Sequence, residues 1–180
     1  MATLIPRRLL MIPLLGVAAF SFVPIIKPIL GPIPQEEFNF LWRDGVCIQS
    51  TLSTCGAASV ATILGYFGHE TYEAKIAAEA YSYIGGTEAW YLARTARSRG
   101  FKVDFDSTSG FAPEGGLPVI AGVLIGSSGH FIAILEQNGD EFVVGDPLRG
   151  RVVLSRGDLE KRYQFTGFHM RISPKRTATR

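Results

Sequence analysis

The pattern of apolar and polar positions divides the chain into an apolar start, a helical middle and a second half of strands. From residue 9 to residue 26 an almost wholly apolar run of 18 residues carries no charge. After residue 55 the apolar positions recur at helical spacing, which predicts helices over 56–67, 71–83 and 87–99. After residue 100 the pattern changes to alternation or short apolar runs, which predict strands over 101–106, 118–125, 130–135, 141–146, 151–154 and 165–172, with a short helical turn over 158–162.

This order of elements predicts an α+β fold, in which N-terminal helices pack on a twisted antiparallel sheet. Residues typical of helix ends support the predicted boundaries. Thr54, Thr71 and Thr87 each stand where a side-chain oxygen can cap the helix that follows. Gly68 and Gly100 follow the first and third helices, at positions where glycine favours a helix stop.

Cys55 stands where a polar loop becomes the first predicted helix. A residue in the first helical turn lies beside unpaired backbone N–H groups and the positive end of the helix dipole. Such a position favours the thiolate, which is the nucleophilic form of cysteine. The small residues at 56–58 leave room for a carbonyl group to approach the sulfur. A buried structural cysteine is the alternative interpretation.

A second chemical signal lies in a predicted hairpin, between a strand that opens with His130 and a strand that closes with Asp146. The Gln-Asn-Gly segment at 137–139 favours a tight turn. With a three-residue loop there, Glu136 pairs with Asp140, and His130 falls opposite Asp146 on the same face of the sheet. A two-residue Asn-Gly turn would shift the pairing by one and send the two side chains to opposite faces. Catalysis therefore requires the three-residue loop.

These motifs together resemble the C39 family of papain-like cysteine peptidases. The quoted residues are Gln49-x5-Cys55-Gly-Ala-Ala, then Gly-His130-Phe and Gly-Asp146-Pro, and the resemblance spans about 46–170. It implies the papain-like fold, with Cys55 as nucleophile, His130 as its base and Asp146 orienting the histidine. It also implies that Gln49 helps to build the oxyanion hole. The best-known members are peptidase domains of bacterial exporters that remove double-glycine leaders.

The apolar run at 9–26 predicts a membrane anchor, since its length is near the lower limit for a bilayer span. Arg7 and Arg8 precede it, and the positive-inside rule then places the N-terminus in the cytoplasm and the following domain outside. A secretory signal cleaved after Ala19 is the alternative. We therefore divide the chain into an anchor or signal segment with a proline-rich spacer (1–34), a peptidase-like domain (35–172) and a basic tail expected to be disordered (173–180).

Charge and residue spacing exclude several other classes of function. Three of the 18 basic residues lie in the first 35 positions, so the remainder has 15 basic and 16 acidic residues and offers no nucleic-acid surface. His69, His130 and His169 show no metal-ligand spacing with the two cysteines, and we expect neither a metal nor a cofactor. Cys47 either packs as a small buried residue or forms a disulfide with Cys55 that would silence the nucleophile.

The sequence thus predicts a membrane-tethered cysteine peptidase that acts on a peptide or protein substrate, with a Gly-Gly leader site as one candidate. Two alternatives stay open. One is an acyltransferase of the transglutaminase kind, in which an amine takes the place of water. The other is a non-catalytic peptide-binding module on the same fold.

Overall fold

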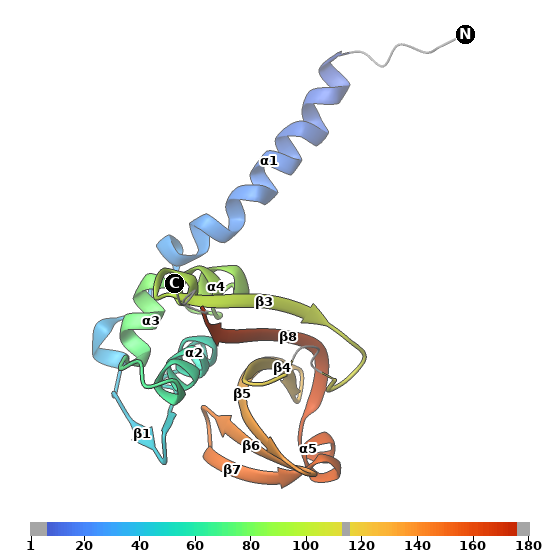
Figure 1. The fold of residues 1–180 in the computed structure, drawn as a ribbon. Coiled ribbons are helices and arrows are strands. Elements are labelled where there is room, and N and C mark those ends of the chain that lie inside the picture. Colours follow the sequence, from blue (N-terminus) through green and yellow to red (C-terminus); the bar gives the residue numbers. More distant parts are fainter. Residues whose placement is uncertain (1–6, 113–115, 176–180) are drawn as a thin grey trace, which may run out of the picture.

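The computed structural model describes residues 7–112 and 116–175, and most of its helices precede most of its strands (Figure 1). The helical elements are α1 (Arg7–Leu30), the short 3₁₀ turn η1 (Gln35–Glu37), α2 (Cys55–Tyr66), α3 (Glu73–Glu79), α4 (Ala89–Ser98) and α5 (Arg156–Arg162). The strands are β1 (Trp42–Arg43), β2 (Val46–Cys47), β3 (Phe101–Ser107), β4 (Val119–Ile125), β5 (Ser128–Asn138), β6 (Glu141–Asp146), β7 (Gly150–Ser155) and β8 (Gln164–Pro174).

The longer strands form one antiparallel sheet of six strands in the order β3-β8-β4-β5-β6-β7. The last strand of the sequence, β8, lies between β3 and β4 and joins β3 to the rest of the sheet (Figure 1). β1 and β2 form a separate two-stranded ribbon just before α2. This arrangement confirms the predicted α+β fold with its antiparallel sheet.

Helix α2 is the buried helix of the domain, because all ten of its residues from Cys55 to Leu64 are buried. It packs on β5 and is flanked by α3 and α4. Gly56 makes the close approach possible, since an added Cβ there would lie 2.7 Å from the Leu92 side chain and 3.3 Å from that of Phe131. A helix buried on every side must be apolar or small on every side, which explains its sequence. Because α2 packs on β5, the position of Cys55 relative to that strand is also fixed.

Alternate residues of β5 belong to two different clusters of the hydrophobic core. Ala133 belongs to the cluster around α2, which covers one face of the sheet. Ile132 and Ile134 belong to the cluster that also holds Phe142 and Tyr163, on the other face. Because side chains alternate across a strand, these clusters identify the faces of β5 and β6.

Two predicted helix boundaries need correction. The helix predicted over 71–83 begins at Glu73 and ends at Glu79, and its N-terminal flanking residue is Tyr72 rather than Thr71. It stops early because Tyr81 adopts a left-handed backbone (φ 52°), which no helix continues through. The third helix, predicted over 87–99 with Thr87 as its cap, begins at Ala89 and ends at Ser98, and its N-cap residue is Glu88.

Three other details of the chain also bear on the predictions. Thr54 is the N-cap residue of α2, as predicted, although its side chain makes no capping hydrogen bond. Gly68 has the expected left-handed backbone (φ 75°). The predicted basic tail partly belongs to β8, which extends to Pro174, and residues 176–180 lie outside the described residues.

Helix α1 projects away from the domain and meets it only near its C-terminal end (Figure 1). There Lys27 bonds Glu88, and the Ile84 N–H donates to the Gly31 carbonyl at 2.7 Å. Within the described residues, no helix combines the length and the hydropathy that crossing a membrane requires. The prediction of a spanning helix therefore gains no support from the structure.

Candidate active site

Cys55 is the first residue of α2, as the sequence pattern predicts, and 8% of it is exposed. It lines a cavity of about 420 Å³ together with His130. The thiol therefore lies at the N-terminal end of a buried helix and still borders open space. This is the environment in which backbone N–H groups can stabilise an anion on or beside the sulfur.

His130 bonds Asp146 and lines the same cavity as Cys55. Its Nε2 is 3.3 Å from Asp146 Oδ1, and the Cys55 side chain also acts on the imidazole. Burial lowers the pKa of His130, but the bonds to Asp146 and Cys55 outweigh burial and raise it to about 9. The imidazole is therefore set up to stay protonated near neutral pH, which suits an ion pair with a thiolate.

Asp146 is fully buried and accepts hydrogen bonds on both carboxylate oxygens. Oδ1 accepts from His130 and from the Leu148 N–H at 2.9 Å. Oδ2 accepts from the Tyr163 hydroxyl at 2.8 Å and from the Arg149 guanidinium at 3.0 Å. Burial alone would raise the pKa of Asp146, but these four donors hold it well below its usual range. The carboxylate therefore stays ionised beside the histidine.

The register that brings His130 and Asp146 together differs from the predicted one. Asn138 pairs with Glu141 across a two-residue Gly-Asp turn, so Glu136 pairs with Val143 and not with Asp140. This register alone would place His130 and Asp146 on opposite faces. A bulge at Leu135 shifts this register by one residue. Glu136 pairs with Val143 and Ile134 pairs with the next residue, Val144, so Leu135 has no partner on β6. The predicted direct pairing of His130 with Asp146 is wrong.

The bulge places the His130 and Asp146 side chains on the same face of the sheet, as the predicted three-residue loop would have done. Beyond it, Ala133 pairs with Gly145, so Asp146 lies opposite Ile132, two residues from His130. Residues two apart on a strand share a face, and the two side chains are therefore diagonal neighbours.

Gln49 lies beside this cluster and is 8% exposed. Its backbone N–H donates to the Pro147 carbonyl at 2.9 Å, next to Asp146. Its side-chain Nε2 donates to the Thr51 carbonyl at 2.6 Å, and Oε1 is buried with no partner among the described residues. The structure thus brings all four predicted site residues to one place, Cys55 and His130 in one cavity and Gln49 and His130 in the next.

Two adjoining cavities form a cleft across the site. The first, of about 420 Å³, holds Cys55, and the second, of about 390 Å³, holds Gln49. Leu52, which is 87% exposed, borders both. Four of the residues that line the first cavity are glycines, Gly85, Gly86, Gly122 and Gly129. Glycine allows a ligand to approach the backbone closely at these positions.

Three residues of this site were not predicted from the sequence. Arg149 and Tyr163 bind Asp146, and Lys27 lines the first cavity. Arg149 follows the aspartate by three residues, so a turn after Asp146-Pro could have suggested it. Tyr163 and Lys27 arrive from distant parts of the chain, and no local pattern signals either of them.

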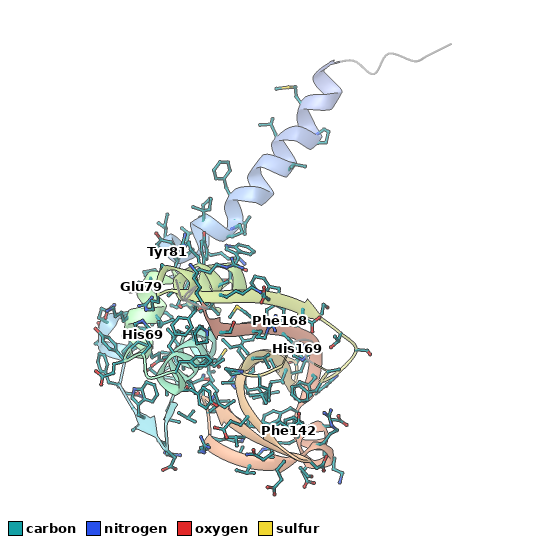
Figure 2. All side chains as sticks on the ribbon, in the orientation of Figure 1. His69, Glu79, Tyr81, Phe142, Phe168 and His169 are labelled. Atoms are coloured by element: carbon teal, nitrogen blue, oxygen red, sulfur yellow. The ribbon has the colours of Figure 1, made fainter. Side chains whose placement is uncertain are left out.

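The remaining cysteine and the other two histidines line neither cavity of the site. Cys47 and Cys55 are both free thiols, and Cys47 is 1% exposed. Burial, with the Glu73 charge beside it, raises the pKa of the Cys47 thiol to about 12. Figure 2 shows His69 beside the helices and His169 over the sheet. No group of three metal-binding side chains occurs among the described residues.

Comparison with known proteins places the fold and the site in one family. The model of the Peptidase C39 family matches residues 43–177. This chain belongs to the peptidase C39 family. The resemblance that the Cys, His and Asp motifs suggested is therefore confirmed, and no match was found among curated protein sequences.

Solved structures show the same fold. A double glycine motif protease from an AMS/PCAT transporter, crystallised with its leader peptide, is 24% identical with a TM-score of 0.60, over 72% of this chain and 91% of that one. The peptidase domain of Streptococcus ComA is 18% identical with a TM-score of 0.61, over 72% and 98%. The C39-like domain of a Vibrio parahaemolyticus toxin secretion ATP-binding protein is 16% identical with a TM-score of 0.53, over 69% and 100%. The predicted papain-like peptidase fold is confirmed.

Proposed function

We propose that this C39 family member is a cysteine peptidase that cleaves a peptide bond through Cys55, His130 and Asp146, with Gln49 at the oxyanion. One observation carries the proposal: a single buried histidine bonds an ionised aspartate and lines the same cavity as a helix-terminal cysteine. A nucleophile, its base and a group that orients the base are the parts that thiol catalysis needs.

The chemistry follows from these positions. The Cys55 thiol first gives its proton to His130, and the resulting thiolate attacks the carbonyl carbon of the substrate. The Gln49 amide and the N–H at the start of α2 face the oxyanion that forms. The C–N bond then breaks as the imidazolium gives its proton to the leaving amine, which leaves a thioester on the sulfur. Water, with His130 as base, hydrolyses the thioester and frees the thiol. Asp146 holds the imidazole in one tautomer throughout.

The cleft supports a substrate with small residues beside the scissile bond. Gly85 and Gly86 have backbones with φ of 120° and 132°, and together with Gly122 they line the cavity beside Cys55. At Gly122 an added Cβ would lie 2.6 Å from the Thr166 hydroxyl, so only glycine fits at this position of the wall. A Gly-Gly site, of the kind that a leader peptide carries, can approach such a glycine-lined wall closely. We include it as the substrate class of this proposal.

A quenched fluorescent peptide with a Gly-Gly site tests the proposal on the purified, reduced chain. Cleavage should be abolished in Cys55→Ala and kept in the matched variant Cys47→Ala. Peptides with Val in place of either Gly should be cleaved at least tenfold more slowly. Cleavage that survives in Cys55→Ala would overturn the proposed nucleophile.

The same assay separates the two alternative functions. With a primary amine added, an acyltransferase would give the amide product in preference to the free acid. A non-catalytic module would bind the peptide without cleaving it, and a thiol-reactive probe would fail to label Cys55. Release of the free acid in preference to the amide, with the amine present, excludes both.

Membrane tethering is a separate part of the proposal and rests on the sequence. Arg7 and Arg8 precede the uncharged run at 9–26, and this order favours an outward-facing domain. Protease added to intact spheroplasts should then digest the domain, while the chain sediments with membranes after an alkaline wash. Recovery of the full-length chain in the wash supernatant would exclude the anchor.

A further inference from the structure

Glu73 is a buried carboxylate that the proposed mechanism does not use. It begins α3, and only 1% of it is exposed. Its Oε1 accepts a hydrogen bond from the Ser50 N–H at 2.7 Å, and its Oε2 accepts one from the Ser50 hydroxyl. Burying a charged group is costly unless hydrogen bonds replace its water, so both bonds to Ser50 are strong constraints on that residue.

Ser50 is the residue after Gln49, and its N–H belongs to the peptide group that joins them. The Gln49 N–H on the other side donates to the Pro147 carbonyl at 2.9 Å. The backbone of Gln49 is therefore fixed at both of its peptide groups. One bond ties it to the residue after Asp146, and the other ties it to Glu73.

The side chain of Gln49 depends on the same loop. Its Nε2 donates to the Thr51 carbonyl at 2.6 Å, one residue beyond Ser50. Its Oε1 is buried without a partner among the described residues, so no bond to this atom fixes the amide plane. The direction of the remaining amide N–H is therefore set by where the 49–51 backbone lies.

We propose that Glu73 is a positioning residue for the oxyanion site, and that it acts by holding Ser50 and through it the Gln49 amide. This inference rests on the proposed peptidase function and assigns Glu73 no contact with substrate. An oxyanion donor acts in the transition state, so a displaced Gln49 amide lowers kcat and leaves KM nearly unchanged. A shift of about 1 Å in such a group costs up to about 100-fold in rate.

Three variants of the full chain test this, with cleavage of the Gly-Gly peptide measured as kcat and KM. Glu73→Ala should lower kcat by about 10- to 100-fold with little change in KM. Glu73→Gln should keep kcat within a few-fold, because an amide oxygen still accepts from the Ser50 N–H. Glu79→Gln is the matched control on the same helix, since Glu79 bonds Arg99 away from the site, and it should match the wild type.

The decisive measurement is the double variant Gln49→Ala with Glu73→Ala. If Glu73 acts through Gln49, removing it should cost almost nothing once the amide is gone. An equal loss in both backgrounds would overturn the inference, because a general structural defect is additive with Gln49→Ala. A folded Glu73→Ala chain with unchanged kcat would overturn it as well.

Two further readouts keep the outcome unambiguous. If Glu73→Ala does not fold, Ser50→Ala removes one of the two bonds and should lower kcat by a few-fold through the same non-additive route. An unchanged kcat in folded Ser50→Ala, or a loss that is fully additive with Gln49→Ala, would then overturn the inference. Failure of the peptidase proposal would give a different result, namely peptide cleavage that persists in Cys55→Ala.

Discussion

His130 and Asp146 are diagonal neighbours on one face of the sheet, 3.3 Å apart through Nε2 and Oδ1, although they are not a register pair. The bulge at Leu135 creates this relationship by shifting β5 one residue relative to β6. Bulges increase local twist and re-aim the side chains beyond them. Here the re-aimed side chain is the proposed catalytic base. The pair is also buried, so its charge state affects both folding and activity.

We expect the stability of the folded chain to depend on pH through this pair. The pKa of His130 is raised to about 9, so its contribution is complete below about 6.5 and is lost as pH rises toward 9. The pKa of Asp146 is lowered, so its contribution is present above about 3.9 and is lost as pH falls further. Urea unfolding from pH 3 to 10 should therefore show highest stability between about pH 4 and 6.5.

The matched variant for this pH profile is His130→Gln, which keeps a polar side chain and does not titrate. Its unfolding free energy should lose the decline between pH 6.5 and 9, while the decline below pH 4 remains. A wild-type profile that is flat from pH 6.5 to 9.5 would contradict the raised pKa of the histidine.

The positions of the site residues along the chain could be predicted, but the register between two of them could not. Cys55 is marked by the change from a polar loop to a small apolar helix, a local signal that the buried α2 confirms. The hairpin signal around Gly139 is also local, and the turn forms there. The bulge at Leu135 lies four residues before the turn, inside β5, where no turn residue marks it in the sequence.

Contacts between distant segments could not be predicted either, because no local pattern signals them. Tyr163 reaches Asp146 only because α5 and the start of β8 fold back along the sheet. The helix predicted to run to residue 83 ends at Glu79, because the chain needs a turn there that local helix propensity opposes. Helices and strands were thus predictable, whereas the partners of the buried aspartate were not.

Tyr163→Phe should weaken the site without removing any proposed catalytic residue. The hydroxyl donates to a buried carboxylate, and bonds to charged groups contribute about 1.5–3 kcal/mol. We expect an unfolding free energy lower by about that amount at pH 6. The pKa of Asp146 should rise as well, so acid unfolding should begin at higher pH. Thermal melts from pH 3 to 7 would measure both effects.

The exposed Tyr81 supplies the control, since half of it is open to solvent and its ring packs on Tyr91 and Arg94. Tyr81→Phe should leave the acid-unfolding midpoint in place. Equal midpoints for wild type and Tyr163→Phe would show that the Tyr163 hydroxyl does not stabilise the ionised aspartate.

The two cysteines should behave as opposites. Cys55→Ala should abolish cleavage and labelling by iodoacetamide in the folded chain. Cys47→Ala should keep both cleavage and labelling, because the pKa of the Cys47 thiol is raised to about 12 and the thiolate does not form. It should lower the free energy of unfolding by about 1 kcal/mol, because Cys47 is buried. Mass spectrometry of labelled peptides, together with the fluorescent assay, checks this.

Oxidation tests whether the same two cysteines form a switch. If they bond under oxidising conditions, the wild type should gain activity with mild reductant while Cys47→Ser is active without it. Equal activity of the two proteins without reductant would exclude the switch and leave Cys47 as a packing residue.

Lys27 should affect substrate binding although it lies before the region that the family model matches. Its Nζ is 3.0 Å from Glu88 Oε1, which also accepts from the Tyr83 hydroxyl at 3.2 Å. Tyr83 and Glu88 flank the glycines that line the cavity beside Cys55. Loss of the ion pair should loosen this wall, so Lys27→Ala should raise KM by about two- to fivefold and leave kcat nearly unchanged.

The pair is partly open to solvent, with 41% of the Lys27 side chain and 22% of the Glu88 side chain exposed. Its effect should therefore shrink at high salt, where exposed charges are screened. Glu88→Gln should give a similar KM, and the double variant should be no worse than either single one. Lys75→Ala is the matched control, because Lys75 lines a different cavity. A Lys27→Ala chain with wild-type KM at low salt would show that this segment supports the helix α1 junction without shaping the cleft.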